Sequence, residues 1–184
     1  MNESYAPAIR EAIQQRDERH LLDILARIPE QDRTHQVNET VRGMPPLLAA
    51  ATTGQLGLTT ALLDAGAAVE GHNLFGMTAL HLAAAHGHVP TVEKLIQYDA
   101  PVNARNEHGI TPLMSAAQNN RADAVEVLLE AGADPSRVDR QGRTAEAMAT
   151  GEAQQVLVAH RERIVLRAAA DVSEEPAPRA RRRM

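Results

Sequence analysis

Residues Asn73–Arg105, NLFGMTALHLAAAHGHVPTVEKLIQYDAPVNAR, decide the fold of this chain, because their pattern recurs at a fixed interval. Thr78 and Leu80 reappear 33 residues later as Thr111 and Leu113. Four glycines mark the same 33-residue interval, at Gly43, Gly76, Gly109 and Gly142. Self-similarity at this period predicts an array of stacked repeats.

Each repeat is expected to fold as a turn followed by two short helices. In the quoted unit, Gly76 supplies positive φ for a tight turn, and Thr78 follows at a helix N-cap. Residues 79–86 form the first helix, narrow on one side because of its alanines, and Gly87 ends it. Residues 89–97 form the second, antiparallel helix, with an apolar inner face. This inner face consists of Val92, Leu95 and Ile96.

The two ends of the chain are expected to cap the array. Upstream, residues 8–15 and 20–26 form a helix pair, followed by a polar loop over 27–36. The fourth unit keeps Gly142 and Thr144, but its helix is expected to stop early, at Gly151. Downstream, one helix from 152 to about 169 covers the last repeat with apolar side chains. These are Val156, Leu157, Ile164 and Val165.

We therefore divide the chain into four parts. Residues 1–39 are the N-terminal capping helix pair and loop, and 40–151 are the repeats, three full units and the start of a fourth. Residues 152–170 are the C-terminal capping helix, and 171–184 are a disordered basic tail. The tail arginines serve either to solubilise the chain end or to contact an anion.

The repeat resembles the ankyrin family. The sequence Thr78-Ala79-Leu80-His81, followed by Ala83-Ala84 and Gly87-His88, matches the pattern of that family closely. Thr111-Pro112-Leu113 matches the same frame, with Met114 in place of His, while Pro45 replaces the capping Thr of the first unit. The resemblance implies an all-α solenoid of helix-turn-helix units with β-turn or hairpin loops and capping repeats. It also implies that His81 and His88 tie adjacent loops together by hydrogen bonds.

Composition narrows the functional classes. The chain has 184 residues and no cysteine, so disulfides and thiolate zinc sites are excluded. Its net charge of −5 gives no support for nucleic-acid binding. The charged start lacks the apolar core of a secretory signal. The uncharged stretch 43–63 is predicted to form two short helices around Gly54 instead of a membrane span. We expect a soluble, cytoplasmic and monomeric protein, with no membrane contact and no cofactor.

The sequence offers little for catalysis. It has no Gly-x-Ser-x-Gly elbow and no glycine-rich phosphate loop, and Glu126 and Glu130 are expected on a solvated helix face. We therefore predict no catalytic residue and a non-enzymatic protein. A metal-binding or enzyme-accessory role for His81, His86 and His88 remains an alternative.

The family resemblance implies a concave surface for a protein partner, formed by the turn tips and the exposed side of each first helix. The predicted partner-binding residues, taken by register, are Arg42, Met44, Thr53, Leu74, Phe75, Met77, His86, Arg105, His108, Ile110, Gln118, Asn119, Arg140 and Arg143. The single Phe75 lies on a turn tip, and Met44, Met77 and Ile110 are expected to be exposed beside it. An inhibitor or immunity-type protein that blocks a partner enzyme is a narrower alternative, and a purely architectural spacer is another.

Overall fold

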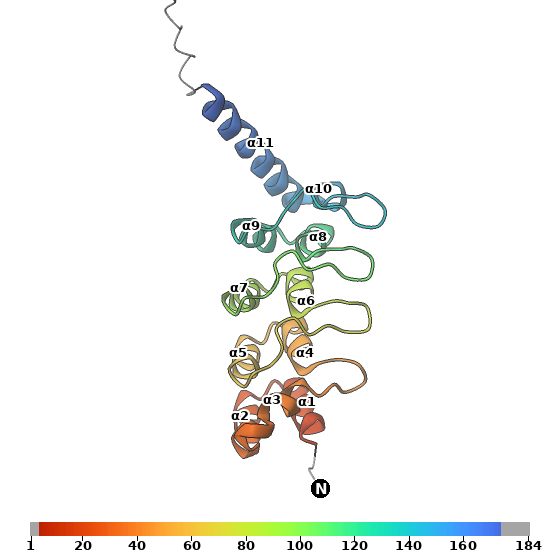
Figure 1. Cartoon of the computed structure of the whole chain (residues 1–184), viewed down its shortest axis with the longest axis vertical. Coiled ribbons are helices and arrows are strands. Elements are labelled where there is room, and N and C mark those ends of the chain that lie inside the picture. The colour runs from red at the N-terminus through yellow and green to blue at the C-terminus, as the bar shows by residue number, and fades with distance from the viewer. Residues whose placement is uncertain (1–3, 174–184) are drawn as a thin grey trace, which may run out of the picture.

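The computed structural model describes residues 4–173 as a row of stacked helix pairs (Figure 1). The helices are α1 (Ala6–Gln15), α2 (Glu18–Arg27), α3 (Glu30–Asn38), α4 (Pro46–Thr52), α5 (Leu56–Asp64), α6 (Ala79–His86), α7 (Val89–Gln97), α8 (Pro112–Gln118), α9 (Ala122–Glu130), α10 (Ala145–Met148) and α11 (Gly151–Ser173). Between residues 4 and 173, β-pairing is limited to isolated antiparallel bridges, Val41 with Met44 and His72 with Thr78.

The array repeats one unit along its long axis. The pairs α4/α5, α6/α7 and α8/α9 lie one above another, and long loops extend from the same side of each level (Figure 1). This arrangement confirms the predicted all-α solenoid. The uncharged stretch 43–63 forms α4 and α5 around Gly54, which has a φ of 67°. Within residues 4–173, no helix is both long enough and apolar enough to cross a membrane.

Local sequence explains where the helices begin and end. The Thr111 hydroxyl accepts from Met114 N at 3.3 Å, and the Thr144 hydroxyl accepts from Ala147 N at 3.2 Å, each at a helix N-cap. Pro45 makes no side-chain cap for α4, but Pro46 at the first helical position fits the helix without losing a hydrogen bond. Gly87 ends α6 in the left-handed region, as predicted.

One continuous apolar core runs through the stack. It extends from Ile9 in α1 to Leu157 in α11. Ala83 and Ala84 are fully buried in α6, so neighbouring first helices approach closely. Val92 and Leu95 are buried as predicted, whereas Ile96 is half-buried. Each unit therefore shares its core with its neighbours.

The predicted polar loop over 27–36 is wrong, because most of it belongs to α3. This helix has acidic residues Glu30 and Asp32 in its first turn, which favour the positive end of the helix dipole. It buries Val37 and Gln36, and the Gln36 Oε1 atom accepts from Tyr5 N at 2.9 Å. A helix with so few buried side chains carries almost no apolar periodicity in its sequence.

Gly151 does not end the helix of the fourth unit. That helix, α10, already ends at Met148, and Gly151 instead begins α11 with a φ of 55°. The Asn120 Oδ1 atom accepts from Ala153 N at 3.0 Å and so holds the start of α11. A Cβ at Gly151 would lie 2.7 Å from Asn120 Nδ2, so a larger residue there would displace the Asn120 side chain in addition to the strain of a positive φ.

The C-terminal helix covers the last repeat only with its first half. Leu157 is buried and Val156 half-buried, but Ile164 and Val165 are 52% and 61% exposed, so the prediction that all four cover the array is wrong. The reason is length, since α11 runs past the end of the stack (Figure 1). It also continues to Ser173, beyond the predicted start of the tail at 171. Residues 174–184 of that tail lie outside the described residues.

Candidate interaction surface

Three of the four loops end in a tight tip built on one Asn or Asp side chain, whereas the first tip is closed by backbone bonds between Val41 and Met44. The Asn73 Oδ1 atom accepts from the backbone N–H groups of Phe75 and Met77, at 2.9 and 3.1 Å. Asn106 and Asp139 hold the next two tips by the same pair of bonds. A glycine with positive φ completes each tip. We call residues 40–44, 73–77, 106–110 and 139–143 together the tip surface.

The second, third and fourth tips are tied to one another through their backbones. Glu107 N donates to Phe75 O at 3.1 Å, and Arg140 N donates to His108 O at 2.9 Å. A Cβ at Gly76 would lie 3.0 Å from Glu107 N, so the close approach of the tips also requires glycine there. From the second tip to the fourth, the tip surface is therefore held in a fixed order along the stack.

The most exposed apolar side chains of the tip surface belong to the second tip. Leu74 is 77% exposed and Phe75 is 62% exposed. This agrees with the predicted position of Phe75 on a turn tip. Water-exposed apolar pairs of this size are typical of contact sites for other molecules.

The other predicted apolar residues are less exposed than expected. Met44 and Ile110 are half-buried against the core, so their predicted exposure is wrong. Met77 is also half-buried, and its sulfur accepts from Asn106 Nδ2 at 3.0 Å. Each of these side chains follows its tip glycine and turns back towards the stack. The apolar part of the tip surface is therefore centred on Leu74 and Phe75.

The predicted charged and polar residues of the tips are exposed. They are Arg42, His108, Arg140 and Arg143 within the tips and Arg105 directly beside the third tip. Arg143 is paired with Asp139, at 2.8 Å between Nη2 and Oδ2, and Arg105 Nη2 donates to Val138 O at 2.8 Å. The hydrogen bond from Arg143 N and those from its side chain lower the pKa of Asp139, so its carboxylate holds the last tip in ionised form.

The remaining predicted residues lie at the far end of the first helices. Thr53, His86, Gln118 and Asn119 are exposed there. His86 Nδ1 lies 2.8 Å from Leu82 O, and Asn119 Nδ2 donates to Ser115 O at 2.8 Å, so both bond to their own helices. Since α6 has eight residues, about 12 Å separates this end from the tips. The structure thus places the predicted residues in two groups.

Two of the three clustered histidines hold the array together. His81 is fully buried and accepts from Thr78 N through Nδ1 at 3.2 Å, which leaves its Nε2–H to donate to Ile110 O at 3.0 Å. His88 Nε2 lies 3.1 Å from Thr52 O of the preceding unit. Burial lowers the pKa of His81, despite the opposing effect of its backbone hydrogen bonds. This bridging confirms the role implied by the family resemblance.

The metal-binding alternative receives no support from this geometry. Both ring nitrogens of His81 are engaged, and the rings of His86 and His88 stack in parallel with centroids 5.7 Å apart. Within residues 4–173, no group of three His, Asp or Glu side chains is placed to hold a metal ion.

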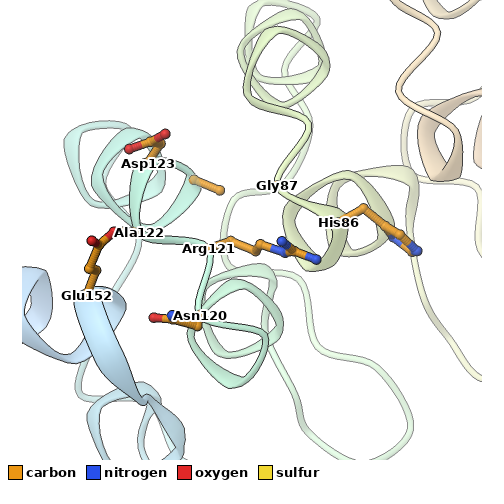
Figure 2. A pocket seen from close by; sticks show the side chains of 8 residues that line it. His86, Gly87, Asn120, Arg121, Ala122, Asp123 and Glu152 are labelled. Carbon is orange, nitrogen blue, oxygen red and sulfur yellow. The ribbon is translucent and has the colours of Figure 1, made fainter.

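Two hollows add residues that sequence reasoning did not select. One hollow, of about 210 Å³, lies beside His86. The Arg121 side chain extends towards the His86 ring, and Asp123 and Glu152 lie on the side of Arg121 away from His86 (Figure 2). Arg121 Nε donates to Ala85 O at 3.3 Å, which fixes the side chain across Gly87. The sequence signal for this site is the 33-residue period, which places Asn120 where the preceding unit has Gly87; the structure gives both residues a positive φ.

The second hollow, of about 610 Å³, lies within the tip surface. Its lining includes Thr40, Leu74, Arg105 and Glu107. Thr40 and Glu107 were not among the predicted partner-binding residues. No pattern within one unit reveals this hollow, because its lining comes from three successive loops.

The comparisons with known proteins agree with the geometry. A family model described as ankyrin repeats (3 copies) matches residues 9–106, 47–139 and 91–164. Together these matches extend from residue 9 to residue 164. Among curated proteins, none matches the chain significantly.

Proposed function

Because this chain belongs to the ankyrin repeat family, whose repeats are generally protein–protein interaction modules, we propose that it binds a protein partner on its tip surface. The observation that carries this proposal is the exposure of Leu74 and Phe75 on a rigid, hydrogen-bonded tip. Burying either side chain against a partner would stabilise a complex by about 1.5–3 kcal/mol. Little order has to be created on binding, because the tips are already fixed.

The helix-end group forms a second, polar part of the proposed surface. Thr53, His86, Gln118 and Asn119 offer donors and acceptors beyond the apolar centre. An apolar centre with a polar surround is the usual anatomy of a protein interface. We assign the affinity mainly to Leu74 and Phe75, and the orientation of the partner to the polar residues.

The proposal is tested by capture of partners with the purified chain and mass spectrometry. Phe75→Glu is expected to lower capture of a specific partner at least about tenfold, since about 1.4 kcal/mol corresponds to a factor of ten. Leu166→Glu is the matched control, because Leu166 is 70% exposed but lies on the projecting part of α11. Circular dichroism checks that both variants remain folded.

The opposite result is equally clear. A partner captured to the same extent by the wild type and by Phe75→Glu would show that the tip surface is not the binding surface. Loss of capture only in Leu166→Glu would move the interface to α11.

A blocking role is the narrower form of the proposal. In that form, the captured partner is an enzyme whose active site the tip surface occupies. Adding the wild-type chain would then abolish the activity of that enzyme, and adding Phe75→Glu would not. Activity that persists with the chain bound would leave a scaffolding role instead.

A further inference from the structure

Three exposed arginines with free donors lie on or beside the tip surface. Arg42, Arg105 and Arg140 are exposed there, each in or beside a different tip. Within residues 4–173, the side chains of Arg42 and Arg140 take part in no hydrogen bond or ion pair. Arg105 uses one N–H for Val138 O and keeps others available. Arg143 is excluded from this set, because Asp139 neutralises it.

Negative charge lies mainly on the other side of the repeats. Along the second helices and their ends, the exposed carboxylates are Asp64, Glu93, Asp99, Asp123, Glu126 and Glu130. Within the four tips, Glu107 is the one exposed carboxylate, since Asp139 is buried. The net charge of −5 therefore conceals a surface of opposite sign at the tips.

The free arginines lie on both sides of the apolar pair. Arg42 belongs to the first tip, Leu74 and Phe75 belong to the second, and Arg105 and Arg140 lie at the third and fourth. Packed helices lie about 8–10 Å apart, and an extended chain advances about 3.3 Å per residue. One tip therefore corresponds to about three residues of an extended partner.

We propose that the partner presents an acidic, extended polypeptide segment to the tip surface. The segment has a large apolar residue that contacts Leu74 and Phe75, with one carboxylate about three residues away on the side of Arg42 and two more about three and six residues away on the other side. The planar guanidinium groups of Arg42, Arg105 and Arg140 match these carboxylates in shape and charge. The hollow beside Leu74 and Arg105 provides room for the apolar side chain. This inference rests on the proposed function and specifies the chemistry of the partner.

Selection from a library of displayed random peptides tests the inference. Peptides of about twelve residues are long enough to cross four tips. We expect the selected sequences to be enriched in Asp and Glu on both sides of an apolar residue, with binding weaker at about 300 mM than at about 50 mM salt.

Charge variants identify the surface responsible. The triple variant Arg42→Gln, Arg105→Gln and Arg140→Gln is expected to bind the selected peptides on the order of tenfold more weakly. The double variant Arg42→Gln and Arg140→Gln keeps the bond from Arg105 to Val138, and it is expected to lose part of the peptide binding. The control, Arg19→Gln, Arg27→Gln and Arg167→Gln, changes the net charge equally at exposed positions away from the tips. Its binding should match that of the wild type.

Several results would overturn the inference. The selected peptides could depend on Phe75 and yet lack acidic enrichment, or bind both triple variants equally. Either result would exclude an acidic partner and leave the proposed function standing. Tighter tip-dependent binding of a single-stranded oligonucleotide, or tip-dependent self-association in light scattering, would assign the arginines to another occupant. A selection that yields no Phe75-dependent peptide would contradict the proposed function itself.

Discussion

At the scale of single residues, the last tip differs from the two before it. Asp139 occupies the position held by Asn73 and Asn106, and its carboxylate accepts from Gln141 N and Arg143 N at 2.8 and 2.9 Å. The same backbone geometry is thus built with an ionisable group. The pKa of this group is lowered in the folded chain, chiefly by the hydrogen bond from Arg143 N.

This difference predicts that the stability of the folded chain depends on pH in the acidic range. The stabilising effect of Asp139 is complete above its unfolded pKa, about 3.9, and is lost as the pH falls through the lower folded pKa. Asp139→Asn should therefore lose less stability than the wild type between about pH 6 and about pH 3, as measured by urea unfolding. The reciprocal variant Asn73→Asp should lose more. An unchanged pH dependence in Asp139→Asn would show that the carboxylate does not hold this tip.

A second residue-scale prediction concerns Thr59 in α5. Its side chain is fully buried, and within the described structure its hydroxyl has no hydrogen-bond partner. Val92 and Val125 stand one and two periods later. Thr59→Val keeps the shape, removes the unsatisfied hydroxyl, and should raise the free energy of unfolding by about 1 kcal/mol.

Denaturant unfolding of Thr59→Val checks this expectation, with Thr60→Val at the neighbouring half-buried position as the control. The control should change stability far less. A loss of stability in Thr59→Val would mean that the hydroxyl is satisfied in solution.

At the scale of elements, the loops between units are joined by asparagine bridges with one exception. Asn103 Nδ2 donates to Gly132 O at 3.2 Å, and Asn103 Oδ1 accepts from Asp134 N at 2.9 Å. Asn38 makes the same two kinds of bond to the loop after α5. One period before Asn103 stands Glu70, whose carboxylate cannot donate a hydrogen bond. The N–H that would correspond to that of Asp134 is also absent, because residue 101 is proline. At this level the Tyr98 hydroxyl instead bonds to Asp64, linking α7 to α5.

Glu70→Asn should supply the missing bond. The new amide would donate to the carbonyl of Asp99 and raise the free energy of unfolding by about 0.5–1 kcal/mol. Glu70→Gln is the control, because it removes the same charge with a longer side chain. Equal effects of the two variants in urea unfolding would assign the change to charge and contradict the bridge.

The elements also show what the sequence could predict. The bounds of α6 and α7 follow from Thr78, Gly87 and the apolar periodicity, all of which act within one unit. In contrast, the sequence of α3 gives almost no periodic signal, because this helix buries few residues. Propensity and periodicity cannot show that α11 extends beyond the end of the stack that it caps.

The candidate surface was predictable to a similar extent. The exposure of Phe75 follows from its position before a turn glycine. The half-burial of Met44 and Ile110 does not, because it depends on packing against the shared core of the stack. The hollow beside Leu74 likewise requires three loops in their spatial order.

At the scale of the whole molecule, the stack separates its core, its acidic side and its tips. Shared burial between units fixes the order of the tips, and backbone hydrogen bonds join the second, third and fourth tips. Leu74 and Phe75 thereby become part of one continuous surface. The central claim is that a protein partner contacts the chain at this surface.

Site-specific photocrosslinking in cells tests that claim most directly. A benzophenone amino acid is placed at position 75 in the tip surface or at position 126 on the exposed side of α9. We expect a discrete crosslinked protein from position 75 and none from position 126. A crosslinked partner from position 126, with none from position 75, would contradict the claim.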